Sequence, residues 1–195
     1  MFFLILCCVL LCACTAPIDD DLNNNTTPSI AQKPDSSQTL PLQELPLFDD
    51  AAGKFSIYFP TPPKKSKQSR EVDIGALTMT QWVAQDNAGQ YYVVSYADYP
   101  KAVLRLGSDK QLLKGIKERL LSTLHAQTTQ EETLSLKEGH QGIAFKAVAK
   151  RQHWHLDYHL YLVNQRLYQL GIHSAIGPIQ PQDSLDFFGN FKLME

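Results

Sequence analysis

The distribution of large apolar residues confines the folded part of this chain to the region after residue 45. Residues 14–45 are rich in Asp, Asn, Thr, Ser, Gln and Pro, and almost no large apolar residue precedes Leu40. Such a segment cannot bury enough surface to offset the entropy lost on folding. We therefore expect a disordered tether over residues 14–45 and a single globular domain over residues 46–195, which is long enough to bury a sizeable core.

Residues 1–13 form the longest apolar run of the chain. A membrane-spanning helix needs roughly 20 apolar residues, whereas the core of a secretory signal needs about 7 to 15. The run therefore has the length of a signal peptide, and the alternative is a short buried N-terminus. Leu11-Cys12-Ala13-Cys14 resembles the bacterial lipobox. The resemblance implies that Cys14 is lipidated and becomes the first residue of a mature lipoprotein.

All four cysteines lie within the first 14 residues. The domain after them therefore has no thiolate for catalysis or for a cysteine zinc site, and it cannot form a disulfide. A lipid anchor at Cys14 would place the protein in the cell envelope, within about 30 Å of a membrane surface. Thr15 is not the Asp that retains enteric lipoproteins at the inner membrane. The periplasmic face of the outer membrane is therefore favoured if the host has two membranes.

Charge is divided unevenly between the tether and the domain. Five acidic residues and one lysine give residues 14–45 a formal charge of −4, which leaves +2 of the chain's −2 for residues 46–195. This near-neutral balance predicts no nucleic-acid partner. A composition of 44% hydrophobic and 19% charged residues is typical of a globular protein and too polar for a membrane protein with several spans.

Short segments with alternating polar and apolar residues predict β-strands through most of the domain. The expected strands are residues 54–59, 67–72, 76–84, 90–96, 133–136, 142–150, 153–163 and 167–173. In residues 90–96, large side chains occupy both alternating sets of positions. This pattern predicts a sheet that is covered on both faces.

Two helices interrupt the strands. Ser108 and Gln111 have the spacing of a capping box, and apolar residues at helical spacing follow, which predicts a helix over residues 109–126. A short helix is expected from Pro181 to Gly189. Because the strands occur in runs around isolated helices, we expect an α+β fold with an antiparallel β-sheet flanked by α-helices.

Three segments carry a resemblance to a known family. They are Lys54-Phe55-Ser56-Ile57-Tyr58-Phe59-Pro60, the hairpin from Leu160 to Tyr168, and the closing residues 187–193. Together with the order of elements, they resemble the PsbP-like fold family over essentially the whole domain. The resemblance implies a PsbP-like α/β/α sandwich and a non-enzymatic binding or assembly factor, often a lipoprotein in bacteria.

The most unusual segment is the histidine-rich strand at residues 153–163. Alternation places its histidines and its aspartate on one face, and on the other face it places Trp154, Leu156, Tyr158, Leu160 and Leu162. Such a strand either shows a polar face to water or binds zinc or copper, because imidazoles at positions i and i+2 can reach one ion. The candidate ligands are His153, His155, Asp157, His159 and, from the next strand, His173.

A metal site on this strand needs a third ligand, because its first and last histidines are roughly 20 Å apart. A three-residue loop at 164–166, which would keep apolar residues of both strands on one face, places Asp157 opposite His173. His155, Asp157 and His173 would then converge. The alternative is a hydrogen-bonded pair of Asp157 and His173 without a metal.

No nucleotide-binding loop, G-x-S-x-G motif or H-E-x-x-H motif occurs in the chain. Glu131 and Glu132 are adjacent on a strand, so they point to opposite faces and make a poor acid/base pair. We therefore expect no enzyme and no required cofactor, but a membrane-tethered, non-catalytic binding or assembly lipoprotein of the cell envelope. Its partner would be an envelope protein or a small ligand. The alternatives are a zinc- or copper-binding lipoprotein and an envelope hydrolase with a site assembled from scattered residues.

Overall fold

Antiparallel strands dominate the computed structural model, which describes residues 45–194 apart from 73–74, 105–106, 137–138 and 152. The predicted signal peptide, Cys14 and the tether up to residue 44 lie outside the described residues. The strands are β1 (Leu47–Asp50), β2 (Phe55–Tyr58), β3 (Lys64–Val72), β4 (Gly75–Gln85), β5 (Tyr91–Asp98), β6 (Gln127–Ser135), β7 (Gln141–Ala149), β8 (Trp154–Val163), β9 (Arg166–Ser174) and β10 (Lys192–Leu193). The helices are α1 (Lys101–Leu104), α2 (Asp109–Leu124) and α3 (Pro181–Phe188).

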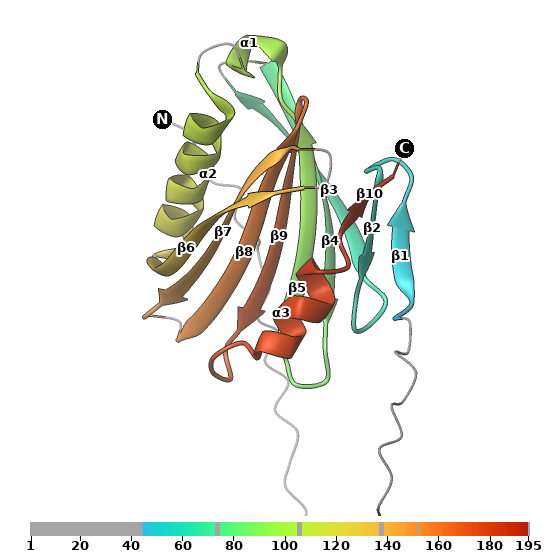
Figure 1. The fold of residues 1–195 in the computed structure, drawn as a ribbon, viewed down its shortest axis with the longest axis vertical. Helices are drawn as coiled ribbons and strands as arrows, with labels where there is room; N and C mark the ends of the chain where they lie inside the picture. The colour runs from blue at the N-terminus through green and yellow to red at the C-terminus, as the bar shows by residue number, and fades with distance from the viewer. Residues whose placement is uncertain (1–44, 73–74, 105–106, 137–138, 152, 195) are drawn as a thin grey trace, which may run out of the picture. The chain divides into compact units, whose positions relative to one another are not determined.

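Seven of the described strands form a large sheet in the order β3-β4-β5-β9-β8-β7-β6, and every neighbouring pair is antiparallel (Figure 1). Strands β3 to β5 form one set of consecutive hairpins and strands β6 to β9 form another. The pairing of β5 with β9 joins the two sets into one sheet. The predicted α+β fold with an antiparallel sheet is confirmed.

Helix α2 packs against one face of the large sheet, over β7 and β8. Its start is fixed by the predicted capping box: Gln111 donates its backbone N–H to the Ser108 hydroxyl, and the Gln111 side chain accepts the Ser108 N–H. Leu113 is the most buried apolar residue of the helix. Lys117 Nζ lies 2.5 Å from Glu131 Oε2, and this ion pair ties the helix to β6.

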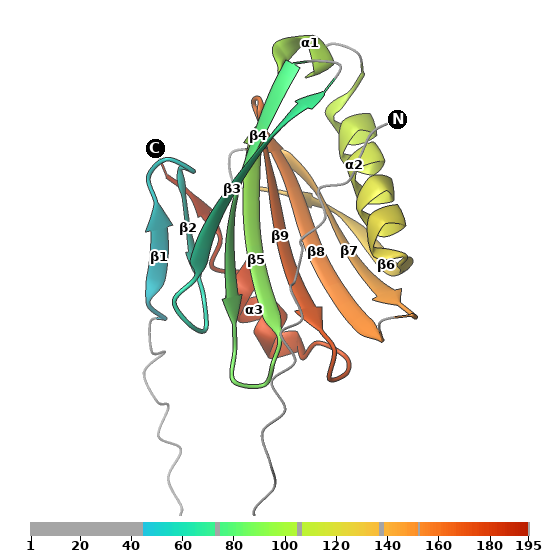
Figure 2. The ribbon, with the colours of Figure 1, turned by 180° about the vertical axis from the view of Figure 1, so that it is seen from behind.

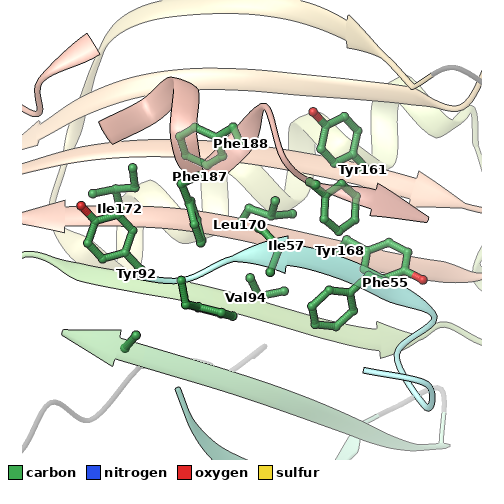
Figure 3. Packing of buried hydrophobic residues seen from close by; sticks show 13 residues of the cluster. Phe55, Ile57, Tyr92, Val94, Tyr161, Tyr168, Leu170, Ile172, Phe187 and Phe188 are labelled. Carbon is green, nitrogen blue, oxygen red and sulfur yellow. The ribbon is translucent and has the colours of Figure 1, made fainter. Parts of the chain in front are cut away.

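The opposite face of the sheet carries α3 and a small antiparallel sheet in the order β1-β2-β10. Helix α3 lies in front of β5 and β9 in Figure 1 and behind them in the reverse view of Figure 2. Phe55 and Ile57 of β2 and Phe187 of α3 are fully buried in one cluster with Val94 and Leu170 of the large sheet (Figure 3).

Strand β5 is buried from both sides, as its sequence predicts. Tyr92 and Val94 belong to the cluster on the α3 face, while Val93 and Ser95 point to the other face. All four side chains are buried. Both faces of β5 are therefore covered at these positions.

The turn between β8 and β9 is shorter than predicted. Val163 pairs with Arg166, so two residues lie between the strands instead of the three predicted at 164–166. Asn164 adopts a φ of 56°, a left-handed conformation that Asn tolerates and that tight hairpins use. The predicted register is therefore wrong.

The prediction failed because the sheet has an apolar layer on each side. Leu160 and Leu162 pack on the α2 face, whereas Tyr168 and Leu170 pack on the α3 face. Placing these four residues on one face assumed that only one face was apolar. Where both faces are covered, hydrophobicity gives no signal for the register of a strand.

Candidate functional site

Strand β8 divides the histidine-rich segment between the two faces of the large sheet. His159 and Asp157 contact α3, and His155 follows them on the same face by alternation. The other set of alternating residues, from Trp154 to Leu162, belongs to the cluster under α2, whereas Tyr161 and Val163 lie on the α3 face with the histidines. His153 precedes the strand, is exposed and has a φ of 56°. The predicted division of faces is confirmed for the residues inside β8.

His173 lies on the face opposite to Asp157. It pairs with Leu156 across the hairpin, whereas Asp157 pairs with Ile172. The His173 ring is buried and its Nε2 is hydrogen-bonded to the Tyr158 hydroxyl. Burial lowers the pKa of His173 to about 4, so the imidazole is neutral at neutral pH.

The predicted convergence of His155, Asp157 and His173 is therefore wrong, as is the predicted pairing of Asp157 with His173. The sheet itself separates the two side chains. Among the described residues, no three His, Cys, Asp or Glu side chains are grouped to hold a metal ion.

A pocket of about 390 Å³ lies on the α3 face of strands β6, β7 and β8. Two rows of side chains cross these strands below it, namely Gln130, Lys146 and Asp157 in one row and Glu132, Ala144 and His159 in the next. Ala144 is the shortest side chain of its row. It therefore forms the floor between Glu132 on one side and His159 on the other.

Helix α3 forms the wall of the pocket that faces these rows. Pro181 occupies its first turn, where the fixed φ of proline favours a helix start. Ser184, Leu185 and Phe188 then line the pocket from adjacent turns of the helix. Phe188 is buried, whereas Leu185 is 63% exposed. The helix therefore supplies one hydroxyl group and an apolar surface that extends to the rim.

Asp157 is the buried charge of the pocket. Its Oδ2 accepts a hydrogen bond from Ser184 Oγ at 2.7 Å, and Lys146 Nζ lies 3.6 Å from the same oxygen. Burial raises the pKa of the Asp157 carboxyl, while Ser184 and Lys146 oppose this shift and Glu132 adds to it. Ionisation of Asp157 is therefore disfavoured by burial and depends on the nearby Lys146 cation and the Ser184 hydrogen bond.

His159 contributes a neutral ring to the pocket wall. It stacks on Phe188 at 3.9 Å between ring centroids with an interplanar angle of 12°, and its Nδ1 is hydrogen-bonded to the Tyr161 hydroxyl at 3.1 Å. Burial and the charge of Lys146 lower the pKa of His159 to about 4. At neutral pH the ring therefore adds no positive charge to the pocket.

Sequence reasoning identified Asp157 and His159 but not the rest of the pocket. Glu132 was considered only as a partner for Glu131, and Lys146 and Ser184 were not singled out. Lys146 carried a usable signal, since it is the one charged residue inside the otherwise apolar strand β7. A lysine at such a position needs a counter-charge on the next strand, which Asp157 provides.

The fold and the pocket define this chain as an α+β protein with a mostly antiparallel sheet and a polar recess beside a C-terminal helix. Comparison with known protein-family models and with curated proteins returned no match. Within the described part of the chain, no helix combines the length and the apolar composition needed to cross a membrane.

Proposed function

We propose that this chain is a lipid-anchored, non-catalytic binding module of the cell envelope, and that the pocket between α3 and strands β6–β8 is its ligand site. The anchor is supported by the signal-like residues 1–13 and by the lipobox-like sequence that ends at Cys14. We also propose that the α+β fold is a PsbP-like α/β/α sandwich. The packing of helices α2 and α3 on opposite faces of the sheet supports this assignment.

The pocket is the single observation that carries the binding function. Ligand sites are concave, largely apolar and furnished with a few placed polar groups, and they typically have volumes of about 300–1,000 Å³. The pocket combines the apolar surface of Phe188 and Leu185 with the polar groups of Asp157, Lys146 and Ser184. The Ser184 hydroxyl donates a hydrogen bond to Asp157, which also contacts Lys146. These contacts hold the polar side chains of the pocket in place.

Substitution of Cys14 tests the anchor. Cells expressing Cys14→Ser should yield a protein that carries no radiolabelled palmitate and leaves the membrane fraction. Cys12→Ser is the matched control, because it makes the same change two residues earlier and keeps Cys14. A Cys14→Ser protein that remains labelled and membrane-bound contradicts the lipoprotein proposal.

Native mass spectrometry tests the binding function. The protein released gently from its membrane should carry a bound molecule, and Ala144→Phe should abolish this occupancy because the larger side chain fills the floor of the pocket. Ala51→Phe is the control, since Ala51 is exposed and lies outside the pocket. A wild-type protein with no bound molecule, or occupancy that persists in folded Ala144→Phe, contradicts the proposal.

A further inference from the structure

The two carboxylates of the pocket keep hydrogen-bond acceptors that are not used by side chains of the described residues. Asp157 uses Oδ2 for both Ser184 and Lys146, and no side chain of the described residues donates to its Oδ1. Glu132 is exposed at the side of the pocket and makes no hydrogen bond or ion pair with the rest of the described chain. A ligand that satisfies these oxygens must bring hydrogen-bond donors.

The charges of the pocket favour a cation. Glu132 and Asp157 are close enough for their charges to oppose each other, and Lys146 is the one lysine among the residues that line the pocket. The Lys146 side chain is 44% exposed, so its ammonium group can turn toward solvent. His159 is neutral at neutral pH. A second positive charge beside the two carboxylates would therefore relieve their repulsion.

The shape of the pocket favours a small ligand with an apolar part. Glu132 pairs with Ala144 on the neighbouring strand, about 4.8 Å away, and Asp157 lies diagonally opposite Ala144 on the other side. The short side chain of Ala144 leaves room for a group between the two carboxylates. Phe188 and Leu185 offer an apolar surface above that position.

We propose that this pocket binds a small organic ammonium ion, with its charged nitrogen between the carboxylates of Glu132 and Asp157. Its short apolar chain lies against Phe188 and Leu185. This inference rests on the proposed binding function and names the ligand class of the same site. An ammonium group supplies up to three donors, which match the free oxygens of the two carboxylates, and such charge-assisted hydrogen bonds are the stronger kind.

Titration of the full-length protein with n-butylammonium tests the proposal. The ring signals of His159 should shift in the NMR spectrum, because His159 lines the pocket. The signals of His173 should stay in place, because this ring is buried on the opposite face of the sheet. n-Butanol, which has the same chain without the charge, should leave both histidines unchanged.

Two substitutions test the role of charge. Glu132→Gln keeps the size of an exposed side chain and should weaken n-butylammonium binding about tenfold. Lys146→Met removes the competing cation and should strengthen binding. Glu118→Gln is the matched control, since it makes the same charge change at an exposed position of α2 outside the pocket and should leave affinity unaltered.

The ammonium proposal is overturned if millimolar n-butylammonium does not shift His159, if n-butanol or butyrate shifts it equally, or if Glu132→Gln binds as well as wild type. These results leave the binding function standing, provided that native mass spectrometry still finds a molecule that Ala144→Phe displaces. The opposite result is that the protein carries no bound molecule while n-butylammonium still shifts His159. That result contradicts the proposed binding function but supports the cation site.

Discussion

At the scale of single residues, His159 and His173 are neutral for the same reason in two different surroundings. One lines a pocket and the other lies in the closed core, and burial lowers the pKa of each from 6.5 to about 4. Between these values the unfolded chain binds protons that the folded protein does not. The stability contributed by each histidine is therefore fully present above pH 6.5 and is lost as the pH falls to about 4.

His173→Gln removes one of these titrations. The wild-type protein should lose more free energy of unfolding than the variant between pH 6.5 and pH 4, by about 3 kcal/mol for a shift of this size. Urea denaturation at several pH values in this range measures the difference directly. If the unfolding free energies of the two proteins depend on pH in the same way, the pKa of His173 is not lowered in the folded state.

Asp157 has the opposite dependence on pH. Its folded-state pKa lies above the ordinary value of 3.8, so its protonated form is favoured in the fold, and stability falls as the pH rises from 3.8 through the raised value. Asp157→Asn does not ionise and should gain stability relative to wild type over that rise. The free energies of unfolding of both proteins, measured from pH 3 upward, give this difference. If the variant instead becomes less stable than wild type as the pH rises, the ion pair with Lys146 outweighs the cost of burying the Asp157 carboxylate.

Alternation along β8 was enough to predict which of its side chains share a face, because period-two alternation is a local property. It was not enough to place His173. The partner of Asp157 depends on the length of the turn, and Asn164 allows a turn of two residues. Ser184 reaches Asp157 only because α3 packs against β8, and no local sequence pattern encodes that contact.

At the scale of elements, the starts of α2 and α3 were readable from the sequence, since Ser108 and Pro181 act within one turn of their own helix. Strands β1 and β10 were not predicted. Each has four residues or fewer, and their pairing with β2 brings residues 47–50 and 192–193 to one strand. Short strands of this kind are stabilised by tertiary packing rather than by local propensity.

Two glycine-to-alanine substitutions should have opposite effects on stability. A Cβ at Gly171 of β9 would lie 2.6 Å from the Tyr158 ring, which is held between Phe145 and His173. Gly171→Ala should therefore destabilise the protein by about 1–3 kcal/mol. A Cβ at Gly115 of α2 meets nothing within 4 Å, so Gly115→Ala should stabilise it by about 0.5–1 kcal/mol.

Thermal unfolding monitored by circular dichroism distinguishes the two outcomes. The melting temperature should fall for the Gly171 variant and rise for the Gly115 variant. A Gly171→Ala protein as stable as wild type would show that Tyr158 can move away from β9.

At the scale of the whole molecule, two hydrophobic clusters share one sheet. Leu160 of β8 and Leu167 of β9 belong to the cluster under α2, while Tyr161 and Tyr168, their neighbours in sequence, belong to the cluster under α3 and the small sheet. Loss of either cluster removes support from the same two strands. We therefore expect residues 45–195 to unfold as one cooperative unit.

Phe191→Ala tests this cooperativity. Phe191 precedes β10 and its ring contacts those of Phe55, Tyr161 and Tyr168 on the α3 face. Its removal should cost about 3–5 kcal/mol of unfolding free energy, as is typical for a buried phenylalanine. Because the clusters share their strands, hydrogen exchange under native conditions should accelerate not only in the small sheet but also in β7, which packs on α2.

The matched variant is Phe145→Ala, which removes a buried ring from the cluster under α2. It should accelerate exchange in the same amides, including those of β2 on the far face. If Phe191→Ala accelerates exchange only in β1, β2 and β10, the small sheet opens independently of the large one. The pocket would then be supported by strands that remain folded when the small sheet opens, and Phe191→Ala would leave ligand binding intact.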